Sequence, residues 1–561
     1  MAEESRGTAT GGRLLVNALR THGADMAFIV PGESYLAVID ALYDEREHIK
    51  LVVCRQEGGA AFMAEAYGKL TGRPGICMVT RGPGATNASI GVHTAFQDSS
   101  PMILFIGQIG SDVVEREAFQ EIDYRRMFGQ MAKWVAQIDR ADRVGEYVSH
   151  AFHVATSGRP GPVVLSLPED MLVAEAPVVP LQRYQRIKAH PGAADMDRVG
   201  AMLAEAQRPL LLLGGGDWDA SGCADIRAFA QAWNLPVGCS FRRQDLLDNR
   251  HANYVGEIGI ATGADLRKRV QESDLVLAVG PRLGEMTTGG YTLFDIPRLR
   301  QRFVHVHPGA DELGRVYQAD LMINAGMQEF AAAIRTLPAP AAIPWKARTE
   351  TMRAEYLKTL EPVATPGALN MSEVVAWLRE RLPAGSILTN GAGNFSGWPQ
   401  RFYTYTGFRT QLGPTNGAMG YGVPAAVAAK LVHPDRTVLC FSGDGDFMMT
   451  GQELATAMQY GAPVLFIVVN NGMYGTIRMH QERDYPARVH GTALSNPDFV
   501  ALAQAYGAHG ELVERTAEFA PALERAVQSG RAALLELRID PEAITTRATL
   551  SAIRAQAQKA R

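Results

Sequence analysis

Residues 441–476 read FSGDGDFMMTGQELATAMQYGAPVLFIVVNNGMYGT, and this stretch decides the fold. An apolar run over 437–441 leads into Gly-Asp-Gly at 443–445, and a helical pattern follows. A second apolar run over 463–469 ends in Asn-Asn-Gly at 470–472. This order predicts strand, turn, helix and strand. Because ligands bind outside the carboxyl ends of parallel strands, we expect both polar clusters at one site.

The two clusters offer a carboxylate and an amide, which are ligands that Mg²⁺ prefers. Asp444 and Asn471 supply hard oxygens, and magnesium fills its remaining positions with water and phosphate oxygens. Gly443 and Gly445 would let the backbone approach an anion closely. Taken singly, the clusters favour a helix cap and an Asn-Gly turn. Their combination in one strand-helix-strand unit predicts a diphosphate held through a divalent cation.

The same residues resemble a known family. The segments GDGDFMMTGQELATAMQYG at 443–461 and PVLFIVVNNG at 463–472 are similar to the signature of thiamine diphosphate enzymes, and within them to the acetolactate synthase group. The resemblance implies thiamine diphosphate and Mg²⁺ as cofactors. It also implies that the metal ligands are Asp444, Asn471 and the backbone carbonyl of Met473.

Length and composition predict a globular protein of several domains. The chain has 561 residues, 47% of them hydrophobic and 20% charged, with a net charge of −4, so no nucleic-acid partner is indicated. The five cysteines are scattered, which favours reduced, buried thiols over a disulfide frame or a zinc site. We find no secretory signal and no apolar run of membrane-spanning length, so a cytoplasmic enzyme is expected.

Alternating helix and strand patterns recur in three blocks of the sequence. They predict an α/β fold of three doubly wound parallel-sheet domains, and the resemblance implies the thiamine diphosphate-binding fold. The expected domains are an N-terminal pyrimidine-binding domain at 1–175, a central domain at 193–337 and a C-terminal diphosphate-binding domain at 365–545. Three glycines at 214–216 are a weak nucleotide signal. FAD occurs in the central domain of some relatives, and the sequence leaves it open.

Glu57 is the leading candidate for catalysis outside this stretch. It opens a helical pattern in RQEGGAAFMAEAYGKLTG at 55–72, where an acidic residue is also favoured by the helix dipole alone. The family carries a Glu here, and the resemblance implies that Glu57 holds a proton at the aminopyrimidine ring of the cofactor. A carboxyl group among apolar neighbours has a raised pKa, which suits that role.

The resemblance assigns further residues to the site. Met419 would prop the cofactor into a bent shape, although a core methionine on a helix is common. Gln120, next to Phe119, would line the reaction pocket across a subunit boundary. The other expected cofactor-binding residues are Gly391, Asn394, Gly417, Gly443, Gly445 and Tyr474.

Three positions depart from the acetohydroxyacid synthase pattern. The family's carboxylate-binding Arg is Met286 here, and a Trp that favours 2-ketobutyrate is replaced by His480. Glu33 stands where those enzymes have Gly and pyruvate decarboxylase-like enzymes have Asp. Glu33 is either an acid near the reacting carbon or a solvated helix cap. His480 is a candidate for acid-base work, although a surface role is more common.

The resulting hypothesis is a thiamine diphosphate- and Mg-dependent enzyme. It would decarboxylate a 2-oxo acid with acyl-carbanion transfer, as an acetolactate synthase-like carboligase, in a homodimer or homotetramer with intersubunit active sites. Because Met286 removes the expected acceptor-binding Arg, the alternative is a non-oxidative 2-oxo acid decarboxylase or aldehyde lyase. A different class, an inactive homologue acting as a regulatory binding partner, is disfavoured by the presence of Glu57, Asp444 and Asn471.

Overall fold

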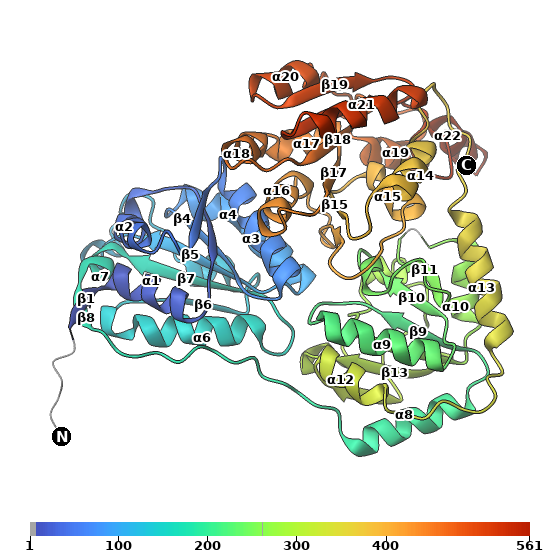
Figure 1. Cartoon of the computed structure of the whole chain (residues 1–561), viewed down its shortest axis with the longest axis horizontal. Helices are drawn as coiled ribbons and strands as arrows, with labels where there is room; N and C mark the ends of the chain where they lie inside the picture. Colours follow the sequence, from blue (N-terminus) through green and yellow to red (C-terminus); the bar gives the residue numbers. More distant parts are fainter. Residues whose placement is uncertain (1–6, 261, 561) are drawn as a thin grey trace. The chain divides into compact units, whose positions relative to one another are not determined.

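The computed structural model describes residues 7–260 and 262–560. These residues form three six-stranded parallel sheets with helices between the strands, and one two-stranded ribbon (Figure 1). The prediction of three doubly wound α/β sheets is confirmed. The chain divides into two compact units, one of residues 1–187 with 427–432 and one of residues 188–426 with 433–561. The exact domain limits expected from the sequence stay a prediction.

The first unit contains the N-terminal sheet, drawn in blue and cyan in Figure 1. Its strand order is β3-β2-β4-β5-β7-β6, and every pair in it is parallel. The strands are β2 (Met26–Ile29), β3 (Lys50–Val53), β4 (Gly75–Val79), β5 (Met102–Gln108), β6 (Trp134–Gln137) and β7 (Pro162–Pro168). The helices are α1 (Gly11–Thr21), α2 (Leu36–Asp44), α3 (Glu57–Thr71), α4 (Pro83–Asp98), α5 (Tyr124–Phe128), α6 (Val144–Thr156) and α7 (Glu169–Val173).

A short antiparallel ribbon was not expected from the sequence. It joins β1 (Thr8–Thr10) to β8 (Glu175–Pro177), which lies at the expected end of the N-terminal domain. Strands of three residues are too short to show an alternating pattern, so periodicity could not reveal them.

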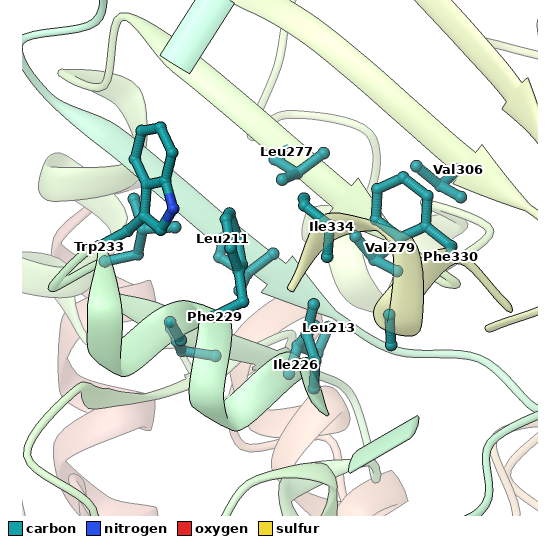
Figure 2. Close-up of a cluster of buried hydrophobic side chains, with 14 of the residues drawn as sticks. Leu211, Leu213, Ile226, Phe229, Trp233, Leu277, Val279, Val306, Phe330 and Ile334 are labelled. Carbon is teal, nitrogen blue, oxygen red and sulfur yellow. The ribbon is translucent and has the colours of Figure 1, made fainter. Parts of the chain in front are cut away.

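The second unit begins with the central sheet, which has the order β11-β10-β9-β12-β13-β14. Its strands are β9 (Pro209–Leu213), β10 (Val237–Ser240), β11 (Tyr254–Ile258), β12 (Leu275–Val279), β13 (Arg302–His307) and β14 (Leu321–Asn324). Its helices are α8 (Ala193–Glu205), α9 (Ala220–Ala232), α10 (Ala264–Gln271), α11 (Glu285–Thr288) and α12 (Met327–Ile334). Helices α9 and α12 pack on the same face, and Figure 2 shows Phe229 near Leu211 and Phe330 near Val279 and Val306 of the strands.

The glycine run at 214–216 allows two strand ends to approach each other. A Cβ added at Gly215, whose φ is +70°, would lie 2.0 Å from the carbonyl oxygen of Gly280. The carbonyl of Gly214 accepts a hydrogen bond of 2.8 Å from Trp218 Nε1. These contacts explain the glycines as a tight turn.

The C-terminal sheet belongs to the same unit and has the order β16-β15-β17-β18-β20-β19. Its strands are β15 (Ile387–Asn390), β16 (Gln411–Leu412), β17 (Val438–Gly443), β18 (Leu465–Asn470), β19 (His509–Val513) and β20 (Ala533–Arg538). The helices from the second linker onward are α13 (Lys346–Thr359), α14 (Met371–Arg381), α15 (Gly397–Phe402), α16 (Gly422–Val432), α17 (Asp444–Thr450), α18 (Glu453–Gln459), α19 (Gly475–Asp484), α20 (Phe499–Ala505), α21 (Thr516–Gln528) and α22 (Leu550–Lys559).

Three local features of this unit are not evident from the sequence pattern. Helix α16 begins only at Gly422, because Gly417 and Gly420 adopt positive φ values of +73° and +80° that a right-handed helix excludes. The segment after Asp444 forms two short helices in place of one. The tail, which lacks an apolar pattern, still forms α22, since Arg554 pairs with Glu482 at 2.7 and 2.8 Å.

The five cysteines are all buried and free of disulfides, as expected. None of the helices found in residues 7–260 and 262–560 has the length and apolar character needed to cross a membrane.

Candidate active site

A cavity of about 230 Å³ lies at the carboxyl ends of the central strands of the C-terminal sheet. Strands β17 and β18 pair in parallel, with Gly443 opposite Val469, so the residues that follow them emerge at the same edge. Asp444 and Asn471 both line this cavity. The structure therefore brings together the two polar clusters that the sequence placed on neighbouring strands.

The cavity occupies the point where the chain changes direction across the sheet. From β15 the chain goes first to β16 on one side and later to β17 on the other. The cavity is lined by Gly393 and Asn394, which follow β15, and by Gly443 and Asp444, at the end of β17. Such switch points form crevices that bind ligands in open α/β sheets.

Asp444 is buried but well supplied with hydrogen-bond donors. It is 2% exposed and is the first residue of α17. Its Oδ2 accepts hydrogen bonds from the backbone N–H of Gly472 at 2.9 Å and from Asn496 Nδ2 at 2.7 Å. Burial raises the pKa of Asp444, while these donors work in the opposite direction. A cation bound beside the carboxylate would stabilise its charged form further.

Asn496 is a residue of this site that the sequence analysis missed. Its Nδ2 also donates to Asn470 Oδ1 at 3.0 Å, so one amide ties the carboxylate to the end of β18. Asn496 lies in an irregular segment between α19 and α20, where neither periodicity nor a quoted motif marks it.

The loop after β18 is fixed by a short strand-like pairing. The Tyr474 N–H donates to Thr492 O at 2.9 Å, and the Leu494 N–H donates to Gly472 O at 2.8 Å. The side chain of Asn471 accepts a hydrogen bond of 3.3 Å from the Met473 N–H. As a result Asn471, Met473 and Tyr474 all line the cavity, and their predicted contacts with cofactor and metal stay predictions.

Three helical segments begin at the cavity wall. They are α17 at Asp444, α19 at Gly475 and the 3₁₀ turn Asn394–Ser396. The first N–H groups of a helix have no partner within it and attract anions. At Gly417, also in the lining, an added Cβ would meet no described atom within 4 Å. The wall can thus accept a phosphate group against its backbone.

These donors fit a diphosphate bridged by Mg²⁺. One carboxylate, one amide and backbone carbonyls are hard ligands for a cation that also binds phosphate oxygens. Within the described part of the chain no cluster of three or more His, Cys, Asp or Glu side chains could hold a metal. The oxygen donors that line the cavity are of the kind that a phosphate-bridging Mg²⁺ takes.

Asp446 organises the loops around the cavity. Its Oδ1 accepts hydrogen bonds from the N–H groups of Ala392 at 3.0 Å and Gly420 at 2.9 Å. Burial raises the pKa of Asp446 to about 6. Gly391 does not line the cavity, because the space a Cβ would fill there is taken by Asp446 Oδ1 at 2.0 Å. Gly391 thus permits a close approach, and its predicted cofactor contact stays a prediction.

Two other predicted residues have different positions. Met419 lines the cavity beside Gly417. His480 lies on α19 outside the cavity lining, and its pKa is lowered by burial and by the nearby charge of Arg483. Burial thus favours the neutral imidazole, and the predicted catalytic role of His480 stays a prediction.

Glu57, in the first unit, is the first residue of α3, as expected. It is partly buried, and its Oε2 accepts a hydrogen bond of 2.9 Å from Asn87 Nδ2 on α4. The side chain of Gln56 caps the helix by accepting from the Gly59 N–H at 3.1 Å. Asn87 therefore holds the orientation of the carboxylate.

Glu33 and Gln120 lie around one arginine in the first unit. Arg81 donates to Glu33 Oε1 at 3.5 Å, forms an ion pair with Glu169, and donates through Nε to Phe119 O at 3.1 Å. The Glu33 side chain is 69% exposed. Gln120 has a φ of +68° and packs against Gly82. The structure thus shows Glu33 as part of a charged cluster.

Comparison with protein families gives three matches along the chain. Residues 9–127 match "Thiamine pyrophosphate enzyme, N-terminal TPP binding domain", and residues 196–334 match "Thiamine pyrophosphate enzyme, central domain". Residues 391–537 match "Thiamine pyrophosphate enzyme, C-terminal TPP binding domain". The chain therefore belongs to the thiamine pyrophosphate enzymes, and the prediction of this cofactor is confirmed.

Curated relatives place it more finely. The chain is 32% identical over 537 residues to acetolactate synthase isozyme 2 large subunit of Escherichia coli, covering 94% of this chain and 95% of that protein. It is 33% identical over 552 residues to an acetolactate synthase large subunit of Parasynechococcus marenigrum, covering 95% and 88%. It is an acetolactate synthase-like, thiamine diphosphate-dependent transferase that acts on small molecules. Its reaction class is decarboxylation with carboligation.

Proposed function

We propose that the cavity at β17 and β18 binds the diphosphate of thiamine diphosphate through Mg²⁺. The protein ligands would be the carboxylate of Asp444, the amide oxygen of Asn471 and the carbonyl of Met473. The observation that carries this proposal is that all three residues line one cavity at the ends of two adjacent parallel strands. The helix starts at Asp444 and Gly475 would hold the phosphate oxygens.

The remaining roles follow the resemblance and are consistent with local geometry. Bound thiamine diphosphate supplies the electron sink for decarboxylation. Glu57, oriented by Asn87, would hold a proton at the aminopyrimidine ring, and Met419 would support the bent cofactor. In the family these groups come from two subunits, so we expect a homodimer or homotetramer in which Glu57 of one copy serves the Asp444 site of another.

The donor substrate would be a small 2-oxo acid such as pyruvate. The chemical class of the acceptor substrate follows less directly from the family. Met286 on α11 cannot pair with a carboxylate as the family's Arg does. A second 2-oxo acid would therefore lack one contact in the acceptor position. Reaction of the acyl carbanion with an aldehyde, or its protonation, should then be faster relative to its addition to a 2-oxo acid. This observation favours a 2-oxo acid decarboxylase or aldehyde lyase as the second candidate function.

Cofactor binding is tested by titrating thiamine diphosphate into the full-length apoprotein with and without Mg²⁺, using calorimetry. We expect Mg-dependent binding that Asp444→Ala abolishes and Asp435→Asn, an exposed control ahead of β17, leaves unchanged. Binding that survives Asp444→Ala would refute the metal site. The absorbance spectrum of the purified protein tests FAD in the same preparation.

The reaction itself is tested by product analysis. The loaded enzyme is incubated with pyruvate, and acetolactate and acetaldehyde are quantified against released carbon dioxide. Acetolactate as the main product supports the carboligase, whereas acetaldehyde supports the second candidate. Release of no carbon dioxide from a panel of 2-oxo acids would contradict both and favour the inactive homologue.

A further inference from the structure

A second cavity, of about 150 Å³, lies in the second unit away from the cofactor site. Its lining includes residues of strand β11 and of helices α10, α13 and α15. Arg547, from the C-terminal tail, also lines the cavity. None of its lining residues belongs to the cofactor cavity.

Three lining residues carry buried polar atoms without partners. Both carboxylate oxygens of Glu257, the hydroxyl of Tyr356 and the Nε2 of Gln400 lack a hydrogen-bond partner among residues 7–260 and 262–560. Glu257, on β11, is only 9% exposed. Leaving a buried polar group unpaired costs about 1–3 kcal/mol. Such groups therefore point to a missing partner, and here several of them line one cavity.

Two arginines also line this cavity. Arg401 donates to the carbonyl oxygens of Thr359 at 3.1 Å and Thr546 at 2.7 Å. Its pKa is lowered by burial and by the like charge of Arg547, which also lines the cavity. Two neighbouring guanidinium groups are relieved by an anion between them, and carboxylates match their geometry.

The lining also has an aliphatic part, made by Val255 on β11, Leu266 on α10 and Met352 on α13. It contains two more carboxylates, Asp265 and Glu355, and Glu355 is paired with Arg269 at 2.6 Å. The cavity thus combines a buried acid, a pair of arginines and an aliphatic wall. An engineered apolar cavity of about 150 Å³ holds a molecule the size of benzene. The ligand should therefore be small, with one cationic group, one carboxylate and a short aliphatic part.

We propose that this cavity binds a free α-amino acid with a small aliphatic side chain. The ammonium group has three N–H donors, and the two oxygens of Glu257 with the Tyr356 hydroxyl offer three acceptors. The ligand carboxylate would take the Gln400 amide, Arg401 and Arg547.

The expected protonation of Glu257 in the empty cavity is consistent with this proposal. Burial raises the pKa of Glu257 to about 8, and the charges of Arg242 and Arg547 offset that effect only in part. An ammonium group beside the carboxylate would favour its charged form. The binding should therefore be strongest for ligands that carry the amine.

Calorimetry on the full-length protein tests the proposal with three matched probes. These are 2-aminobutanoate, butanoate, which lacks the amine, and propylamine, which lacks the carboxylate. We expect saturable binding of 2-aminobutanoate, and binding of the other two at least about tenfold weaker, which is 1.4 kcal/mol. Equal binding of butanoate would show an anion site only, and absence of binding would show that water fills the cavity. Either outcome overturns the proposal.

A variant pair tests the role of the carboxylate. Glu257→Gln keeps the side-chain shape but removes the charge, so 2-aminobutanoate should bind at least about tenfold more weakly. Glu350→Gln, an exposed control on α13, should bind like the unchanged protein. Circular dichroism and the thermal midpoint verify that both variants fold. Unchanged affinity in a folded Glu257→Gln variant would also overturn the proposal. The cofactor titration of Asp444→Ala is independent of this result, because the two cavities share no lining residue.

Discussion

Two buried acids at strand ends of the second unit differ in what surrounds them. Asp444, at the end of β17, is 2% exposed and accepts hydrogen bonds from Gly472 and Asn496. Glu257, near the end of β11, is 9% exposed, and its oxygens have no hydrogen-bond partner in the described residues. The two carboxylates are thus similarly buried, but only Asp444 receives hydrogen bonds from protein donors. The comparison shows one carboxylate whose charge is supported by two donors, and one whose oxygens lack any donor among the described residues.

The largest effect is expected from removing the charge of Asp444. Asp444→Asn keeps the side-chain size but removes the charge, so its contact with a cation weakens. We expect product formation at low Mg²⁺ to fall by about a hundredfold or more, with partial recovery as Mg²⁺ is raised. Steady-state rates over a Mg²⁺ series measure this, with Asp435→Asn as the control. A rate that does not depend on Mg²⁺ in either variant would contradict the assignment.

A smaller effect is expected at Asn496, which contacts Asp444. Asn496→Ala removes the 2.7 Å hydrogen bond to the carboxylate and the 3.0 Å link to Asn470. Groups that orient a metal ligand typically matter by 10–100-fold, so Mg²⁺ affinity should fall by about that factor. Calorimetric titration of Mg²⁺ in the presence of cofactor measures it. The adjacent exposed Ser495→Ala is the control, and equal affinities in the two variants would remove Asn496 from the site.

The pH dependence of stability tests whether the Glu257 carboxyl is protonated in the folded protein. Its folded-state pKa, about 8, lies above the ordinary value of 4.5, so the folded protein keeps a proton that the unfolded chain has lost. That contribution to stability is present at low pH and is lost as pH rises through about 8. Arg242 and Arg547 are the charged groups that face this carboxyl.

Glu257→Gln cannot lose a proton, so its thermal midpoint should rise relative to that of the unchanged protein as pH rises from about 4.5 to about 8, with a constant difference above that. The gain should be on the order of 1–3 kcal/mol, the cost of an unpaired buried group. Below about pH 4.5 the two midpoints should converge. Scanning calorimetry without added amino acids measures both curves. Parallel curves from pH 6 to 9 would mean that Glu257 stays ionised throughout.

Much of the fold could be predicted because strong periodic patterns encode it. The apolar runs before Asp444 and Asn471 are buried strands, and their polar ends identify the cavity edge. The assignment to thiamine diphosphate depended on the motif, since each polar cluster alone is also compatible with a cap or a turn. For Glu57, too, the family pattern carried the role, because a first-turn acid is common in helices.

Other features could not be predicted, since they depend on tertiary contacts. Asn496 reaches Asp444 from an irregular loop 52 positions away in sequence. No sequence pattern indicated strand β11. Its pairing with β10 is irregular, because the register shifts between Val237 and Gly238. The cavity of Glu257 joins β11 to α13, α15 and Arg547, which are far apart in sequence, so no local pattern indicates it.

The smallest expected effect compares two glycines that carry the same strain in different surroundings. Gly417 has a φ of +73° and lines the cofactor cavity, whereas Gly461 has a φ of +59° in the turn after α18. At both, an added Cβ would meet no described atom within 4 Å. Alanine should therefore lower the stability of each variant by about 1 kcal/mol, the cost of a left-handed residue with a side chain. Thermal midpoints measure this loss.

The two alanine variants should differ in cofactor affinity alone. A methyl group at position 417 extends into the cavity, so Gly417→Ala should bind thiamine diphosphate a few-fold more weakly, by about 1 kcal/mol or less. Gly461→Ala shares the strain but not the cavity, so its affinity should equal that of the unchanged protein. A loss of affinity in both variants would assign the effect to strain transmitted through the sheet. A loss in Gly417→Ala alone would indicate direct contact between the cofactor and the backbone at this glycine.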